Sequence, residues 1–95
     1  MQQIIISGIV TSAPEQVTRT DGTKYIIFYV ACLNSSNQRE KYSHYRCAYR
    51  VIDIREGDQV FIVGSLRTGI RKDKNGEVYV DLFVIVEHLT IGKRA

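Results

Sequence analysis

The feature of this sequence that most constrains the fold is the near absence of helical periodicity. β-Branched and aromatic residues recur in short runs, and turn-forming residues separate these runs. This pattern is typical of an all-β domain. Asp21-Gly22 and Asn75-Gly76 are strong hairpin signals, because such pairs adopt the positive φ angles that tight hairpin turns need. We therefore expect antiparallel strands, most of them joined by hairpins.

Five strands account for nearly all of the 95 residues. The first is expected from about Gln3 to Thr18, with a break near Pro14. The others are expected over Lys24–Leu33, Lys41–Val51, Gln59 to about Gly69, and Glu77–Leu89. Polar and glycine-containing segments separate them, because such residues favour exposed loops and turns. These segments are the loop Asn34–Glu40, the turn Glu56-Gly57-Asp58 and a charged hairpin tip from Arg71 to Gly76.

Gly8 and Gly64 interrupt apolar strands, where a missing side chain lets a strand bend or lets another backbone approach. Sharp bending is what a small closed barrel needs. The strand number, the length and the long first strand favour one domain, residues 1–95, with a five-stranded Greek-key OB-fold barrel. An open meander or a small sandwich is the alternative. Alternation places in the core Ile4, Ile6, Gly8 and Val10 from the first strand and Ile26, Phe28, Val30 and Cys32 from the second.

The outward-facing residues of these two strands are unusually apolar. The first strand presents Ile5, Ser7 and Ile9, and the second presents Tyr25, Ile27, Tyr29 and Ala31. A fully solvated face would be polar, so part of this surface is expected to be covered. A subunit interface, a platform on which bases stack, or both side by side would explain the pattern.

The stretch Lys41–Arg50 has two chemically different faces when it is read with a two-residue period. One face holds Ser43, Tyr45, Cys47 and Tyr49, and the other holds Tyr42, His44, Arg46, Ala48 and Arg50. If the first set packs inward, the second presents guanidinium groups and flat rings, which suit phosphates and unstacked bases. The alternative is an ordinary solvated sheet face, where such residues are also common. Tyr45 and Tyr49 have the core phase and are expected to be packed rings, as is Tyr79.

The composition permits a phosphate-bearing partner without demanding one. There are 13 Lys and Arg against 10 Asp and Glu, which gives a net charge of +3. The chain lacks a long apolar run or a secretory signal pattern, so we expect a soluble, cytoplasmic protein. Cys32 and Cys47 are expected to be buried, reduced thiols in that compartment, and a disulfide is the alternative. Together with His44 and His88 they form no metal-ligand spacing, so we expect no metal and no cofactor.

Five stretches, taken in order, resemble bacterial-type single-stranded-DNA-binding proteins (SSB) and their smaller primosomal relatives of the PriB-like type. The stretches are IIISGIVTSAPE from Ile4, TDGTKYIIFYVA from Thr20, HYRCAYR from His44, EGDQVFIVGSLRT from Glu56 and DKNGEVYVDLFV from Asp73. The resemblance implies an OB fold, a homodimer or homotetramer, and single-stranded-DNA binding without sequence specificity in replication, recombination or repair. Single-stranded RNA and replication proteins are further partners that it leaves open.

The resemblance also implies which residues act. Bases would stack on sheet aromatics and phosphates would be neutralised by cations. The DNA-binding residues that it implies are Tyr25, Tyr29, Tyr42, His44, Arg46, Arg50, Arg71, Lys72 and Lys74. Further phosphate contacts are expected from Lys24, Arg39, Lys41 and Arg67. The first strand would supply the oligomer interface through Ile5, Ser7 and Ile9.

Three departures from the family pattern stand out. The chain has no tryptophan, so tyrosine, histidine or arginine must supply the stacking. The segment Ile52–Glu56 is too short for the helix that relatives carry there. The sequence stops at Ile91–Ala95 without a flexible linker or an acidic tip, which argues against a full housekeeping hub and favours a phage, plasmid or primosomal variant, or an organism-specific minimal form.

Two other classes of function are alternatives. An OB-fold protein-interaction module would use the same isoleucines and tyrosines to bind a polypeptide, with the arginines at the rim. A nuclease would need clustered carboxylates that hold metal ions. Asp53, Glu56 and Asp58 form the nearest acidic cluster, but they occupy a turn in which acidic residues are ordinary. We therefore expect a binding protein and not an enzyme.

Overall fold

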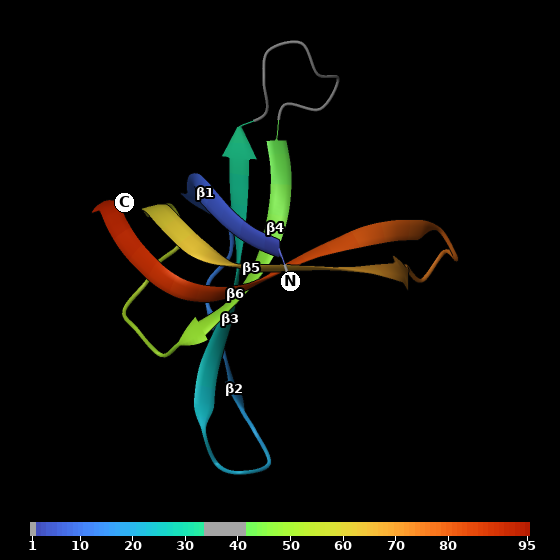
Figure 1. Ribbon diagram of the computed structural model, residues 1–95, viewed down its shortest axis with the longest axis horizontal. Helices are drawn as coiled ribbons and strands as arrows, with labels where there is room; N and C mark the ends of the chain where they lie inside the picture. Colours follow the sequence, from blue (N-terminus) through green and yellow to red (C-terminus); the bar gives the residue numbers. More distant parts are fainter. Residues whose placement is uncertain (1, 34–41) are drawn as a thin grey trace.

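The computed structural model describes residues 2–33 and 42–95, and within these ranges it contains strands and turns but no helix. The strands are β1 (Gln2–Val10), β2 (Glu15–Thr18), β3 (Lys24–Leu33), β4 (Tyr42–Arg50), β5 (Gln59–Lys72) and β6 (Val78–Lys93), arranged as in Figure 1. The expected all-β class is confirmed. The expected first strand is divided into β1 and β2, with the break at the segment that contains Pro14.

The strands close on themselves in the order β1-β5-β6-β4-β3, and β3 pairs in turn with β1. β2 lies beside β3 as the continuation of the first strand. All pairings are antiparallel except that of β4 with β6. This closed Greek-key order is that of an OB-fold barrel, so the fold prediction is confirmed and an open meander is excluded.

Two short pairings hold two larger antiparallel units together. The first unit is β2-β3-β4 and the second is β1-β5-β6. On one side the units meet where Ile9 pairs with Ala31 and Val10 pairs with Val30. On the other side they meet in parallel where Arg46, Cys47 and Ala48 of β4 pair with Phe83, Val84 and Ile85 of β6. We call this second junction the β4–β6 seam.

Both glycines that the sequence singled out lie where backbones come close together. At Gly8, β1 is about to leave β5 and join β3, and a Cβ atom there would collide with the carbonyl of Ala31. At Gly64, the β5–β6 register shifts, and a Cβ atom would collide with the carbonyl of Ile85. The predicted role of these glycines in closing the barrel is confirmed.

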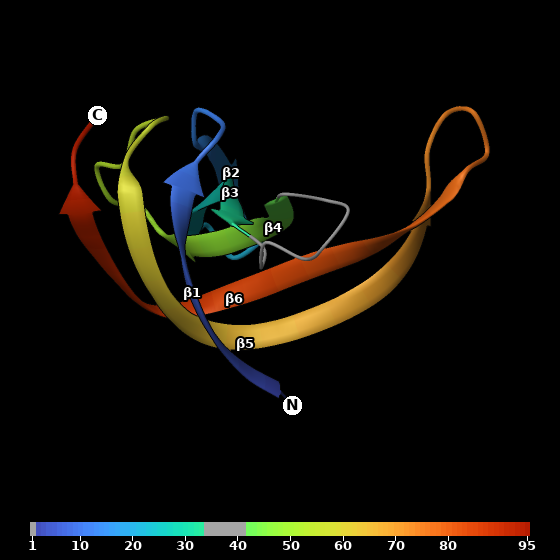
Figure 2. The same ribbon diagram turned by 90° about the horizontal axis from the view of Figure 1, so that it is seen from above.

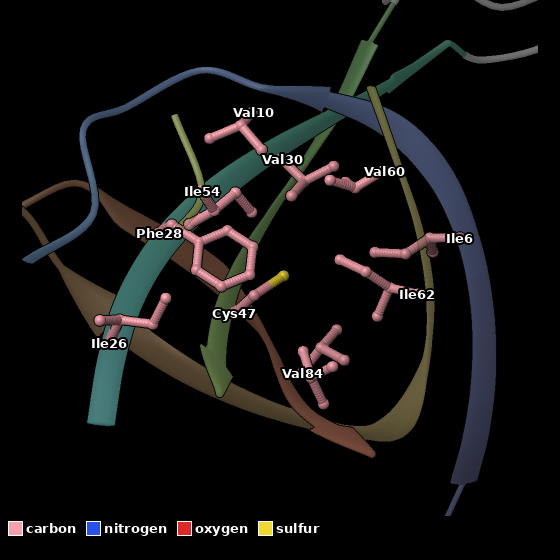
Figure 3. Packing of buried hydrophobic residues seen from close by; sticks show 11 residues of the cluster. Ile6, Val10, Ile26, Phe28, Val30, Cys47, Ile54, Val60, Ile62 and Val84 are labelled. Atoms are coloured by element: carbon pink, nitrogen blue, oxygen red, sulfur yellow. The ribbon is translucent and has the colours of Figure 1, made fainter. Parts of the chain in front are cut away.

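The core fills the barrel and follows the predicted alternation (Figure 3). Its buried members are Ile6, Val10, Ile26, Phe28, Val30, Cys47, Ile54, Val60, Ile62, Val84 and Val86. Ile4, Cys32, Tyr45 and Tyr49 pack against this cluster while remaining partly exposed, as their phase predicts. Phe28 is fully buried at its centre, and the burial of one such side chain stabilises the fold by about 1.5 to 3 kcal/mol.

β5 and β6 run past the barrel as a two-stranded arm, which projects to the right in Figures 1 and 2. β5 reaches Lys72 and β6 reaches Lys93, so both strands are longer than predicted. Arg71 and Lys72 therefore belong to a strand and not to the hairpin tip. The tip itself is organised by Asp73, whose Oδ1 accepts hydrogen bonds from the backbone N–H groups of Asn75 (2.9 Å) and Glu77 (3.0 Å).

The connection between β4 and β5 is an irregular segment with a turn, as its shortness predicts. Asp58 ends this segment as a fully buried carboxylate. It accepts hydrogen bonds from the backbone N–H groups of Arg55 and Ala95 and from the Arg94 guanidinium. The pKa of Asp58 lies below its usual value. The hydrogen bond from Ala95 makes the largest contribution, and the hydrogen bond from Arg55 and the charge of Arg94 add to it. Within residues 2–33 and 42–95 no group of three His, Cys, Asp or Glu side chains is arranged for a metal ion.

Cys32 and Cys47 are both free thiols, as predicted, but only Cys47 is buried, because Cys32 lies at the margin of the core and is partly exposed. Burial raises the pKa of Cys47 to about 12 and also raises that of Cys32. No helix long and apolar enough to cross a membrane occurs in the described ranges. The predicted loop Asn34–Glu40, the strand start at Lys41 and the cation Arg39 lie outside the described residues.

Candidate nucleic-acid interface

A row of alternating rings and cations crosses the outer surface of the barrel at the β4–β6 seam. Tyr29 of β3 pairs with Arg46 of β4, and Arg46 pairs with Phe83 of β6. Phe83 pairs in turn with Arg67 of β5. Directly paired residues of neighbouring strands point to the same face of a sheet. The four side chains therefore form one line over four strands, which we call the central row.

Arg46 is fixed in this row by two contacts. Its guanidinium lies 4.1 Å from the centroid of the Phe83 ring, a close cation–π contact. Its Nη2 donates to Oδ2 of Asp81 at 2.8 Å. The hydrogen bond with Asp81 raises the pKa of Arg46, and the hydrogen bond from Arg46 lowers the pKa of Asp81. Arg46 is thus already neutralised in part by a neighbouring carboxylate.

Asp81 also faces a second cation of the expected site. Nε of Arg71 lies 3.6 Å from Oδ2 of Asp81, and the Asp81 side chain is only 16% exposed. Two arginines therefore share one largely buried carboxylate. A phosphate group that approached this pair would compete with Asp81 for the same guanidinium groups.

Aromatic rings are available beside the row. Tyr29 is 44% exposed and Tyr42, at the beginning of β4, is 50% exposed. His44 is exposed on the same face of β4, two residues from Arg46. Exposed rings on a sheet can stack with bases, because every base has a flat π-face.

The other end of this face carries a second group of rings and cations. Tyr25 of β3 pairs with Arg50 of β4. The guanidinium of Arg19 lies over the Tyr25 ring, 5.0 Å from its centroid. The guanidinium of Arg50 lies 5.1 Å from the centroid of Tyr49 and donates through Nε to the Tyr49 hydroxyl at 3.3 Å.

The structure brings most of the residues expected for DNA binding onto one face. Tyr25, Tyr29, Tyr42, His44, Arg46, Arg50 and Arg71 lie on the outer face of the sheet. Lys72 pairs with Val78 and has the opposite phase from Arg71, so it belongs to the other face of the arm. Lys74 lies in the tip of the arm.

The sequence pattern does not mark Phe83 or Arg19 as residues of this surface. The run Leu82–Val86 is apolar throughout, and this hides the fact that Phe83 faces outward while Val84 and Val86 are buried. Its pairing with Arg46 depends on two strands that are far apart in the sequence. Arg19 stands just before the Asp21-Gly22 turn, where a cation is an ordinary surface residue.

The outer face of β1 is apolar, as expected. Ile5 is 78% exposed and Ile9 is 44% exposed. On β5, which pairs with β1, Phe61 is exposed opposite Ser7. These four residues form a surface that we call the β1 face, and the central row does not include any of them.

A small OB-fold barrel with exposed rings and cations on its outer face is typical of nucleic-acid-binding proteins. The chain belongs to the single-strand binding protein family, whose model matches residues 1–91. The predicted resemblance is thereby confirmed, and with it the prediction that the protein binds single-stranded DNA. No curated protein sequence matches the chain significantly.

Solved structures share the fold at low sequence identity. The Plasmodium falciparum SSB in complex with ssDNA has 20% identity and a TM-score of 0.69, covering 98% of this chain and 96% of its own. The small single-stranded DNA-binding protein of Streptomyces coelicolor has 12% identity and a TM-score of 0.73, covering 95% and 93%. The mitochondrial protein Rim1 of S. cerevisiae has 14% identity and a TM-score of 0.74, covering 99% and 97%.

Proposed function

We propose that this protein binds single-stranded DNA across the outer face of β3, β4, β6 and β5, along the central row, without reading its sequence. The main support for this proposal is the alternation of rings and cations in one line over four strands, formed by Tyr29, Arg46, Phe83 and Arg67. Rings and cations in alternation match a strand in which unstacked bases and phosphates alternate.

The proposed mechanism has a neutral part and an ionic part. Bases stack on Tyr29, on Phe83 or on the planar guanidinium of Arg46, and each stack contributes about 1 to 3 kcal/mol. Phosphates are neutralised by Arg67 and Arg50, with Arg71 and Lys74 on the arm. Each phosphate neutralised on a single strand releases counterions, which makes log K fall with log[salt] by about 0.7 per contact. A duplex binds weakly, because its bases reach the rings only after unpairing.

The remaining predictions are part of the same proposal. The 95 residues act as one OB-fold domain. This domain binds single-stranded DNA and does not catalyse a reaction. It acts in the cytoplasm, in replication, recombination or repair. Copies of the chain associate through the β1 face. An apolar surface of this kind is unfavourable in water, and a second copy would cover it.

The test is a fluorescence-anisotropy titration of labelled oligo-dT, with a duplex of equal length and two salt concentrations. Wild-type protein should bind the single strand in a salt-sensitive manner and bind the duplex far more weakly. Phe83→Leu, which keeps an apolar side chain but removes the ring, should weaken binding by about 5-fold or more, the loss of one base stack.

Arg46→Ala has a matched control in Arg55→Ala. Arg55 is also paired with a carboxylate, at 3.7 Å from Asp53, but it lies in the β4–β5 connection away from the row. Arg46→Ala should weaken binding while Arg55→Ala leaves it nearly unchanged. Absence of binding by folded wild-type protein would refute the proposed function. Equal binding by Phe83→Leu, Arg46→Ala and wild type would remove the central row from it.

A further inference from the structure

A pocket opens at the end of the β4–β6 seam. The parallel pairing stops at Ala48 and Ile85, and beyond these residues the ladder between β4 and β6 is not continued. Side chains of both phases consequently reach one cavity of about 160 Å³. Ala48, Ile85 and Val86 supply its apolar lining. An engineered cavity of about 150 Å³ accommodates a benzene ring, so this pocket can accept a flat ring of similar size.

The rest of the lining is aromatic and cationic. Tyr25 and Tyr49 contribute rings, and Arg19 and Arg50 contribute guanidinium groups that lie over those two rings. Among the described residues, no Asp or Glu lines the pocket. The carboxylate of Asp21 accepts hydrogen bonds from Thr23, and these bonds, with a smaller contribution from the charge of Arg19, lower its pKa. Within the described residues neither Arg19 nor Arg50 is held in an ion pair, in contrast to Arg46 with Asp81.

The pocket is in line with the central row. Arg46 and Arg50 lie on the same face of β4, four residues apart, which corresponds to about 13 Å along a strand. One strand of nucleic acid that lies on the central row can therefore continue to the pocket.

From this geometry we infer that the pocket is a subsite for one nucleotide of the bound strand. The unstacked base enters against Tyr25 and Tyr49, and the adjoining phosphates meet Arg19 and Arg50. This inference rests on the proposed function and adds to it a single anchoring position. It gives roles in binding to Arg19 and to Tyr49, which has the core phase.

The decisive variant fills the pocket without changing its charge. Ala48→Leu adds apolar volume from the outer face of β4, where the native side chain is only partly buried. The variant is titrated with oligo-dT and with a fully abasic strand of equal length, and thermal unfolding verifies the fold. Ala48→Leu should weaken oligo-dT binding by about 5-fold to 150-fold, the range for one base stack. It should leave the affinity for the abasic strand unchanged, because that strand has no base to insert.

Arg19→Ala tests the phosphate contact, with Lys93→Ala as a control of equal charge change near the far end of β6. Arg19→Ala should weaken binding of both strands and reduce the salt slope by about 0.7, while Lys93→Ala does neither. The inference is overturned if Ala48→Leu binds oligo-dT like wild type, or if it weakens both strands equally. In both of these cases the proposed function stands, because wild type still binds. Failure of wild type to bind oligo-dT would overturn both.

Discussion

The carboxylate of Asp81 holds the guanidinium of Arg46 at 2.8 Å, at the point where the proposed DNA path crosses from β4 to β6. The same carboxylate lies 3.6 Å from Arg71. An acidic group in the middle of a surface proposed to bind a polyanion repels phosphates and occupies two of the cations that would attract them. The guanidinium that it holds also lies over the Phe83 ring, 4.1 Å from the ring centroid.

Asp81→Asn should therefore tighten single-stranded-DNA binding. Removing one unit charge about 4 Å from a phosphate relieves roughly 1 kcal/mol of repulsion in a water-like medium, which is about a 5-fold gain in affinity at low salt. Anisotropy titration with oligo-dT measures this gain. Asp53→Asn is the control, because Asp53 also contacts two arginines, Arg55 and Arg94, but lies outside the proposed path. Unchanged or weaker binding by Asp81→Asn would show that Asp81 does not compete with phosphates.

The Arg46–Asp81 pair should make stability depend on pH in the acid range. The hydrogen bond from Arg46 lowers the pKa of Asp81 from its ordinary value of 3.8. A lowered pKa in the folded state means that the stabilisation is complete above 3.8 and is lost as the pH falls through the folded-state pKa. Urea unfolding should show wild type more stable than Asp81→Asn at pH 7, by an amount that shrinks toward pH 3. A difference independent of pH would exclude this linkage.

Any larger residue at Gly64 should destabilise the fold. The Cβ of Gly64→Ala would meet the backbone carbonyl of Ile85, which the β5–β6 ladder holds in place, so we expect a loss of about 1 to 3 kcal/mol from overpacking. Gly69→Ala is the matched control on the same strand, because no atom lies within 4 Å of its Cβ position. That change should stay within about 0.5 kcal/mol. Equal urea midpoints for the two variants would contradict the close approach at Gly64.

The β1 face should govern association. Ile5→Lys places a charge on this face, and light scattering after gel filtration should show dissociation toward the monomer. Ile70→Lys provides the comparison, since Ile5 and Ile70 are both 78% exposed but Ile70 lies on the arm. We expect Ile70→Lys to retain the wild-type mass. If both variants keep that mass, or if wild type is itself monomeric, the β1 face is not the interface.

The parts of the fold that the sequence predicts are those whose signals are local. Strict alternation in β3 and β4 separates the buried Phe28 and Cys47 from the exposed Tyr29 and His44. The predicted turns at Asp21-Gly22 and Asn75-Gly76 are confirmed. Gly22 and Gly76 adopt positive φ angles of 89° and 81°, which glycine accepts readily. The sequence predicts strands that are too short for the arm, because both of its faces are exposed and burial imposes no alternation on residues 70–80.

The sequence does not reveal which distant residues become neighbours. Arg46 meets Phe83 and Asp81 through a parallel pairing of β4 with β6, and no local pattern encodes that register. The run around Phe83 reads as continuous core, because its outward residues are as apolar as its inward ones. The sequence therefore predicts most cations of the proposed site one by one. The partial neutralisation of Arg46 by Asp81 and the pocket beyond Ala48 depend on contacts between distant strands, so only the structure reveals them.

The β4–β6 seam is a junction between two units that are otherwise held together by the short β1–β3 pairing. Tyr29 and Arg46 lie on one side of the seam, and Phe83 and Arg67 lie on the other. A DNA strand bound along this line would act as a clamp that opposes separation of the units. DNA binding should then slow the amide hydrogen exchange of residues 46–48 and 83–85 more than the exchange of other residues within either unit. The reason is that a ligand stabilises the state to which it binds, in which the two units are joined at the seam.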